Sequence, residues 1–268
     1  MATQQQQSAP LICPGHSRPV AHIEFSMPTP DGTFLISACH DKTAQLRNGT
    51  TGDWIGTFDG HKGAVWGAAL DPPAHRAITC SADFSAKLWD ATTGDELATL
   101  PHRHIVRAAD WSPTSSHAIT GGKEAKLRIF DINNTAADPT ILLGHEKMIK
   151  VVKYLDSNTF LSGSDDCTLR LWDVRSGEAT RTLEFAGGVN SVELSADGSF
   201  ATIAAGTEVS FWDVASWQCV ARHTLKVIEA NGYGVNSASL RPDRSRFVAG
   251  GGILWVYEYD YATGEELA

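Results

Sequence analysis

The feature that most constrains this chain is a sequence pattern that returns about every 42 residues. Its clearest marker is an apolar residue, an aromatic residue and Asp, found at 88–90, 129–131, 171–173 and 211–213, with the aspartates 41, 42 and 40 residues apart. A second marker, Gly-His, occurs at 15–16, 60–61 and 144–145, and Pro101-His102 falls between them. Several markers with one period indicate that one small structural unit is repeated along the chain.

The segments between these markers predict strands. The run Thr168-Leu169-Arg170-Leu171-Trp172 alternates polar and apolar residues, as a half-buried strand does. Turn signals of the form Thr-Gly-Asp or Ser-Gly-Glu follow the aromatic-Asp pairs at 51–53, 93–95 and 176–178. With 24 Gly and 8 Trp in 268 residues, the composition favours tight turns and aromatic packing over long helices.

These markers together resemble WD40 repeats, which form β-propellers of four-stranded sheets around a central channel. The resemblance predicts an all-β propeller with six repeats, at approximately 16–60, 61–101, 102–144, 145–184, 185–225 and 226–268, after a disordered tail over 1–9. Similar propellers have seven blades. Two interpretations are therefore open, a ring that closes with six blades and a chain that is one repeat short, and we expect the second. Residues 10–13 are expected to supply the outer strand that seals such a ring.

The resemblance also implies a hydrogen-bonded tetrad of His, hydroxyl, acid and Trp in each repeat. The complete candidate sets are His61, Thr79, Asp83 and Trp89 in the second repeat, and His145, Ser162, Asp166 and Trp172 in the fourth. The altered sets are His102, Thr120, Glu124 and Phe130 in the third, His16, Ser37, Asp41 and Arg47 in the first, and Thr202 and Trp212 in the fifth. Buried indole and hydroxyl groups need partners. We expect the acid to hold the imidazole and the hydroxyl to join His to Trp.

A Ser-His-Asp combination can also be read as a catalytic triad. Here it recurs once per repeat, whereas a catalytic set is expected once, so we interpret it as structural and predict a protein that is not an enzyme and needs no cofactor. The five cysteines contain no Cys-x-x-Cys pair. They therefore indicate reduced thiols in the cytosol or nucleus, with neither a disulfide framework nor a metal site.

Charge and hydropathy exclude further classes. The formal charge is −9, from 22 Lys and Arg against 31 Asp and Glu, which disfavours non-specific nucleic-acid binding over the whole surface. No apolar run approaches the roughly 20 residues that cross a bilayer. The start of the chain lacks the basic and apolar regions of a secretory signal. We therefore predict no membrane insertion.

More specific motifs narrow the resemblance. The segments 52–58, 60–68, 82–90, 126–131, 236–240 and 259–267 resemble the family of serine-threonine kinase receptor-associated proteins. The match departs around 228–234 and at Ile253. This resemblance implies a non-enzymatic, cytoplasmic and nuclear adaptor without a small-molecule substrate. Its implied partners are a survival-of-motor-neuron (SMN) and Gemin-type complex that assembles spliceosomal RNA–protein particles, a cold-shock-domain RNA-binding protein and, in animals, a receptor kinase with inhibitory Smad. RNA contact would be indirect.

Two alternatives remain open at this point. A WD-repeat subunit of a translation initiation factor complex shares the Gly-His-x-Gly-Ala-Val-Trp motif at 60–66. A hydrolase built on a propeller would need a cluster of carboxylates or His in the channel that breaks the repeat.

Propeller topology predicts where a partner binds. The loop before each first strand and the turn between the second and third strands lie on one face around the channel. Six residues fall at such positions: His40, Trp66, Arg107, Lys123, Met148 and Lys150. We interpret them as a basic and aromatic arc that receives an acidic peptide or an RNA phosphate. The alternative is an ordinary solvated rim.

Overall fold

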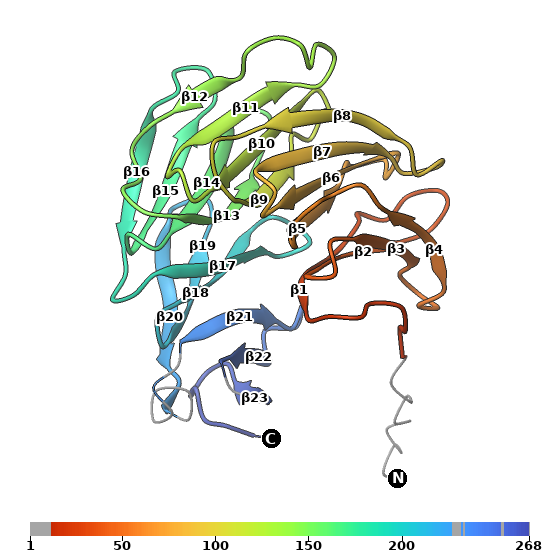
Figure 1. Cartoon of the computed structure of the whole chain (residues 1–268). Helices are drawn as coiled ribbons and strands as arrows, with labels where there is room; N and C mark the ends of the chain where they lie inside the picture. The colour runs from red at the N-terminus through yellow and green to blue at the C-terminus, as the bar shows by residue number, and fades with distance from the viewer. Residues whose placement is uncertain (1–11, 227–231, 233, 253–254, 268) are drawn as a thin grey trace.

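The computed structural model describes residues 12–226, 232, 234–252 and 255–267. Within them, 23 strands form six antiparallel sheets that are arranged like blades around a common axis (Figure 1). The prediction of an all-β propeller with six repeats is confirmed. No helix among the described residues is long and apolar enough to span a bilayer.

Each sheet is a meander in which consecutive strands are neighbours. The first sheet contains β1 (Val20–Phe25), β2 (Phe34–Cys39), β3 (Ala44–Asn48) and β4 (Trp54–Phe58). The second contains β5 (Val65–Leu70), β6 (Arg76–Ser81), β7 (Ser85–Asp90) and β8 (Glu96–Pro101). The third contains β9 (Val106–Trp111), β10 (His117–Gly122), β11 (Leu127–Asp131) and β12 (Thr140–Leu142).

The remaining sheets follow the same order. The fourth contains β13 (Ile149–Tyr154), β14 (Thr159–Ser164), β15 (Thr168–Asp173) and β16 (Ala179–Glu184). The fifth contains β17 (Val189–Leu194), β18 (Phe200–Ala205), β19 (Glu208–Asp213) and β20 (Gln218–Thr224). In the described part of the chain the sixth contains β21 (Val235–Leu240), β22 (Arg246–Gly251) and β23 (Val256–Asp260).

The hydrophobic core is distributed between neighbouring sheets. Leu88 and Leu100 of the second sheet form one cluster with Trp111 and Phe130 of the third. Such pairwise burial explains why the repeat period dominates the sequence, because each sheet must present apolar residues to the sheet on either side of it.

The two end sheets have less of this cover. Ile23 and Phe25 on β1 are 61% and 57% exposed, and Val256 on β23 is 70% exposed. The expected sealing strand is not seen at Ile12 and Cys13, which belong to no strand, while Pro10 and Leu11 lie outside the described residues. Leu267 donates its N–H to the carbonyl of Glu258, and Glu266 pairs with Tyr259. The residues that follow β23 therefore start to pair with its free edge, where a fourth strand would lie. This pairing takes the edge that residues 10–13 would need in a six-bladed ring.

The antiparallel order fixes two faces of the propeller. The loops before each first strand and the turns between second and third strands form what we call the top face. Each of these turns in the first five sheets contains one residue with positive φ: Lys42 (77°), Phe84 (69°), Ala125 (56°), Cys167 (68°) and Gly206 (56°). Only glycine adopts this conformation without steric cost, so a bulky side chain at such a position is unusual.

Candidate functional site: the tetrads and the top face

The second sheet contains a complete tetrad. The Trp89 indole donates to the Thr79 hydroxyl at 2.8 Å, and that hydroxyl donates to Nε2 of His61 at 2.7 Å. The other ring nitrogen, Nδ1, donates to the carboxylate of Asp83 at 2.8 Å. The fourth sheet has the same chain from Trp172 to Asp166 with three distances of 2.7 Å: Trp172 to Ser162, Ser162 to His145, and His145 to Asp166.

The acid of the tetrad is held ionised. Burial opposes its ionisation, but hydrogen bonds from Ser85, from the Lys62 N–H and from His61 outweigh this and lower the pKa of Asp83 to about 2. Burial lowers the pKa of His61, despite the opposing effect of Asp83. The tetrad is therefore a neutral imidazole between a hydroxyl and a carboxylate.

The third sheet uses a different arrangement. The Thr120 hydroxyl donates to Nε2 of His102 at 2.8 Å, but Nδ1 donates to the backbone carbonyl of Leu100 at 3.0 Å. Glu124 instead forms a two-point ion pair with Arg128 at 3.0 and 2.8 Å. Because burial dominates and Arg128 is close, the pKa of His102 falls to about 4.

The first sheet keeps part of the tetrad. His16 bonds Asp41 at 2.9 Å and Ser37 at 2.8 Å, while Arg47 occupies the aromatic position.

In the fifth sheet the prediction that Thr202 belongs to the tetrad is wrong. Ala201 is paired with Trp212, so the position that corresponds to Thr79 is Ile203, and Thr202 is one residue out of register. Ser210 accepts the Trp212 N–H at 2.8 Å in its place.

These sets are poorly suited to covalent catalysis. Thr79 and Ser162 are each 0% exposed, and each hydroxyl is shared between an indole N–H and an imidazole nitrogen. A nucleophile must reach its substrate. These side chains stabilise their sheets.

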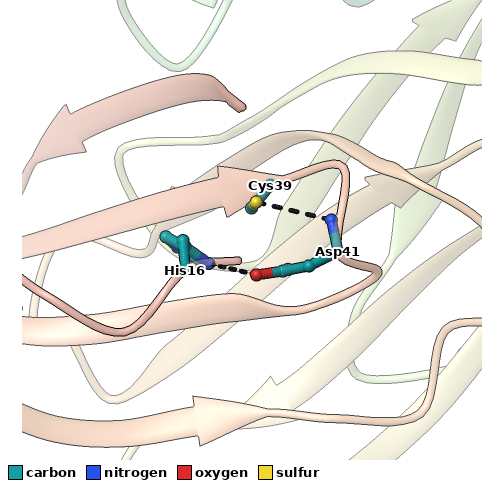
Figure 2. A group of neighbouring side chains, drawn as sticks. All are labelled: His16, Cys39 and Asp41. Carbon is teal, nitrogen blue, oxygen red and sulfur yellow. Dashed lines mark hydrogen bonds and ion pairs between the residues drawn. The ribbon is translucent and has the colours of Figure 1, made fainter. Parts of the chain in front are cut away.

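One group of possible metal ligands, His16, Cys39 and Asp41, occurs among the described residues (Figure 2). Each is already used in a hydrogen bond. Cys39 is 0% exposed, donates to the Arg18 carbonyl at 3.0 Å and accepts the Asp41 N–H at 3.4 Å. Ser81 makes the equivalent two bonds in the second sheet, to the Gly63 carbonyl and from the Asp83 N–H, each at 3.1 Å. Cys39 is therefore a replacement for a structural serine.

Three of the residues predicted for the partner-binding face form one stack. The His40 and Trp66 rings are 4.4 Å apart, and the Arg107 guanidinium lies 4.7 Å from the Trp66 ring centre. Arg107 also donates to the Trp66 carbonyl at 2.9 Å. The buried atoms Nε1 of Trp66 and Nε2 of His40 have no partner among the described residues. These side chains come from the first, second and third sheets, so the stack spans three blades.

The other three predicted residues are less uniform. Lys150 pairs with Asp165 at 2.5 Å and donates to Asn190 at 2.8 Å, so its charge is largely neutralised. Lys123 is exposed, and Met148 is half-buried, with its carbonyl bonded to the Asp165 N–H. The structure brings the six residues to the top face, but the free positive charge is at Lys123 and around Arg107.

Sequence reasoning missed a charged group at the propeller axis. Lys153 on β13 forms an ion pair with Glu24 on β1, across the axis, and lies 3.6 Å from Asp110 on β9. Burial, with a contribution from Glu24, raises the pKa of Asp110 to about 6 in spite of Lys153. The sequence did contain a signal for this group, because its charged residues lie in inner strands that are otherwise mostly apolar. These ion pairs join different repeats and do not recur from one repeat to the next, so the repeat pattern did not reveal them.

The comparisons with known proteins agree with this geometry. The family model for the WD domain, G-beta repeat, matches residues 8–48, 52–90, 94–131 and 138–173. The fold, the tetrads and this match define a WD40-repeat propeller.

The chain belongs to the family of serine-threonine kinase receptor-associated proteins, as its motifs predicted. It is 44% identical to the human member over 261 residues, which is 97% of this chain and 73% of the human protein. It is 45% identical to the member from Dictyostelium discoideum, over 96% of this chain and 86% of that protein. It is also 30% identical to "Eukaryotic translation initiation factor 3 subunit I" of Drosophila pseudoobscura pseudoobscura, over 91% of this chain and 76% of that protein.

Proposed function

We propose that this protein is a non-catalytic WD40 scaffold that acts in RNA–protein assembly. The observation that carries the proposal is its 44% identity, across 97% of its length, to serine-threonine kinase receptor-associated proteins. The absence of a free hydroxyl in the two complete tetrads of the described residues supports a binding role over hydrolysis.

The partners follow from the family. We propose that the protein joins an SMN and Gemin-type complex in the cytoplasm and nucleus, and also binds a cold-shock-domain RNA-binding protein. In an animal it would also link to inhibitory Smad and to a receptor kinase, the second of which is consistent with the name of its relatives. RNA contact would occur through these proteins, because the net charge of −9 opposes broad RNA binding.

Copurification tests the assignment directly. The full chain, tagged and expressed in cells of its source, is recovered and its partners are identified by mass spectrometry. We expect Sm and Gemin-type proteins. Recovery of initiation-factor subunits in their place would support the second candidate, which rests on the 30% identity to the translation initiation subunit. Turnover of generic ester or phosphate substrates by the pure protein would contradict a non-catalytic role.

A second experiment tests whether the partner binds the top face. Arg107, Lys123 and Lys150 are replaced together by Glu, and the copurification is repeated. A matched control replaces Arg175 and Arg241 by Glu, since both are exposed in turns of the opposite face. We expect the triple variant to lose partners and the control to keep them. Because Lys150 is paired with Asp165, a melting curve must first show that the triple variant is folded.

A further inference from the structure

An exposed aromatic residue occupies a sterically unfavourable position on the top face. Phe84 has φ = 69° and is 45% exposed. The turn itself does not need an aromatic side chain, because the corresponding residues of the first, third, fourth and fifth sheets are Lys42, Ala125, Cys167 and Gly206. Because the positive φ recurs in the turns of all five of these sheets, the feature that sets Phe84 apart is its large exposed aromatic ring, and such a ring is a common anchor for a binding partner.

Phe84 is paired with a second aromatic ring. The His104 ring lies 5.2 Å from it, and His104 is also exposed. Nδ1 of His104 accepts the Ile105 N–H at 2.8 Å, so in the neutral ring the proton is on Nε2. The pair therefore offers an apolar surface next to a hydrogen-bond donor.

Backbone hydrogen bonds hold this pair in place. The His102 N–H donates to the Phe84 carbonyl, and the Lys123 N–H donates to the Ile105 carbonyl, each at 2.9 Å. These bonds join the turn of the second sheet, the following loop and the turn of the third sheet. We call the exposed residues Lys62, Phe84, Arg103, His104 and Lys123 the Phe84 platform.

The charge on the platform is positive and uncompensated. None of the ion pairs among the described residues involves Lys62, Arg103 or Lys123. The acids next to these cations in the sequence are already hydrogen-bonded to other groups. Asp83 accepts from His61 and from the Lys62 backbone, and Glu124 accepts from Arg128 and from the Arg103 backbone.

We propose that the Phe84 platform binds an acidic peptide segment that carries one aromatic residue. The aromatic residue packs on Phe84 and His104, and the flanking carboxylates pair with Lys62, Arg103 and Lys123. This inference rests on the proposed scaffold function and gives the chemistry of one partner segment.

A peptide fits these observations better than single-stranded RNA does. Strands without base specificity are bound by successive stacking surfaces. The next aromatic side chain on this face, Trp66, is contacted by His40 and covered by Arg107. The platform therefore presents one apolar contact, which suits one anchoring side chain.

Fluorescence anisotropy with the full chain tests the proposal. The probe is a labelled ten-residue peptide of Asp and Glu around one Trp. It is compared with the same peptide carrying Ala for Trp and with labelled ten-nucleotide oligouridine. We expect the Trp peptide to bind the wild-type protein, and the Ala peptide to bind roughly tenfold more weakly.

The decisive variant is Phe84→Gly. It removes the ring and relieves the backbone strain, so we expect peptide affinity to fall by roughly tenfold while the melting temperature stays the same or rises. A purely structural Phe84 predicts the reverse, a lower melting temperature with unchanged affinity. Ala125→Gly, in the same turn of the third sheet, is the matched control and should change neither affinity nor the response to peptide composition.

A charge variant completes the test. Replacing Lys62 and Arg103 by Gln should weaken peptide binding and reduce its dependence on salt. The proposal is overturned if the wild-type protein does not bind the Trp peptide, if the Ala peptide binds equally well, or if oligouridine binds more tightly and its binding depends on Phe84. These results are independent of copurification, so recovery of Sm and Gemin-type proteins with a failed peptide would overturn only the platform.

Discussion

The second and third sheets have the same backbone but satisfy their buried polar groups differently. In the second, Trp89, Thr79, His61 and Asp83 form one continuous chain. In the third, the Phe130 side chain has no N–H to donate, and the His102 ring donates to a backbone carbonyl. The fold therefore requires that each buried polar atom has a partner, and it does not require one particular set of residues.

The fate of the acid explains how the third sheet differs. Thr79 is paired with Lys87 and Thr120 with Arg128, so these two cations occupy the same position. Lys87 bonds Glu96 of the outer strand at 2.6 Å, whereas Arg128 turns to Glu124. Glu is one methylene longer than Asp, and the guanidinium offers two parallel donors, so the two side chains can form a two-point pair.

The prediction with the largest expected effect tests the ion pair between Glu124 and Arg128. Arg128→Leu leaves the mostly buried carboxylate of Glu124 without its cation, and we expect the free energy of unfolding to fall by about 3 kcal/mol. Lys87→Leu at the equivalent position breaks a more exposed pair and should cost about 1 kcal/mol or less. Denaturant titration of both variants measures the difference. Equal losses would show that the third sheet does not depend on its ion pair.

The second prediction compares the two hydroxyls. Thr79→Val leaves both the Trp89 N–H and Nε2 of His61 without partners, and we expect a loss of about 3 kcal/mol. Thr120→Val leaves only His102 unpaired and should cost about 1 to 2 kcal/mol. Thermal and denaturant unfolding of the pair measures both values. A larger loss at Thr120 would contradict the difference between the networks.

These contrasts show what the sequence could predict. The residue types of the tetrad recur at a fixed period, and the resemblance to WD40 repeats implied that His61, Thr79, Asp83 and Trp89 are joined by hydrogen bonds, as they are. Glu124 pairs with Arg128 in place of His102, and this change of partner depends on side-chain length and direction, which residue spacing does not give.

Other ion pairs follow no pattern that recurs in each repeat. Lys153 pairs with Glu24 from three repeats away, and Lys150 on β13 is neutralised by Asp165, which follows β14 in the same sheet. The prediction of a basic and aromatic arc depended on residue positions and did not include the carboxylate of Asp165.

The third prediction concerns acid. The pKa of His102 is about 4 in the folded protein, below the ordinary value of 6.5, because burial and Arg128 oppose its protonation. Below pH 6.5 the unfolded chain binds a proton that the folded chain does not. Stability is therefore lost as the pH falls from 6.5 towards 4. We expect His102 to account for about 3 kcal/mol of this loss.

His102→Gln should make the acid loss smaller by that amount, since the amide does not titrate. His104→Gln, the same substitution at an exposed position two residues away, is the matched control. Unfolding free energies at pH 7, 6, 5 and 4 give the comparison. Parallel curves for the wild type and His102→Gln would contradict the assignment.

The smallest expected effect extends the comparison to the first sheet, where Cys39 takes the place of Ser81. Both side chains accept a hydrogen bond from the backbone N–H of the tetrad aspartate, and both donate to a backbone carbonyl of the preceding loop. Cys39→Ser should therefore change the free energy of unfolding by about 0.5 kcal/mol or less, while Cys39→Val loses both bonds and should cost about 1 to 2 kcal/mol.

If His16, Cys39 and Asp41 held a metal ion, added Zn²⁺ would stabilise the wild type and not Cys39→Ser. We expect no such difference, because the imidazole and the carboxylate are already bonded to each other and the thiol is already bonded to the backbone, as in the serine-containing sheets.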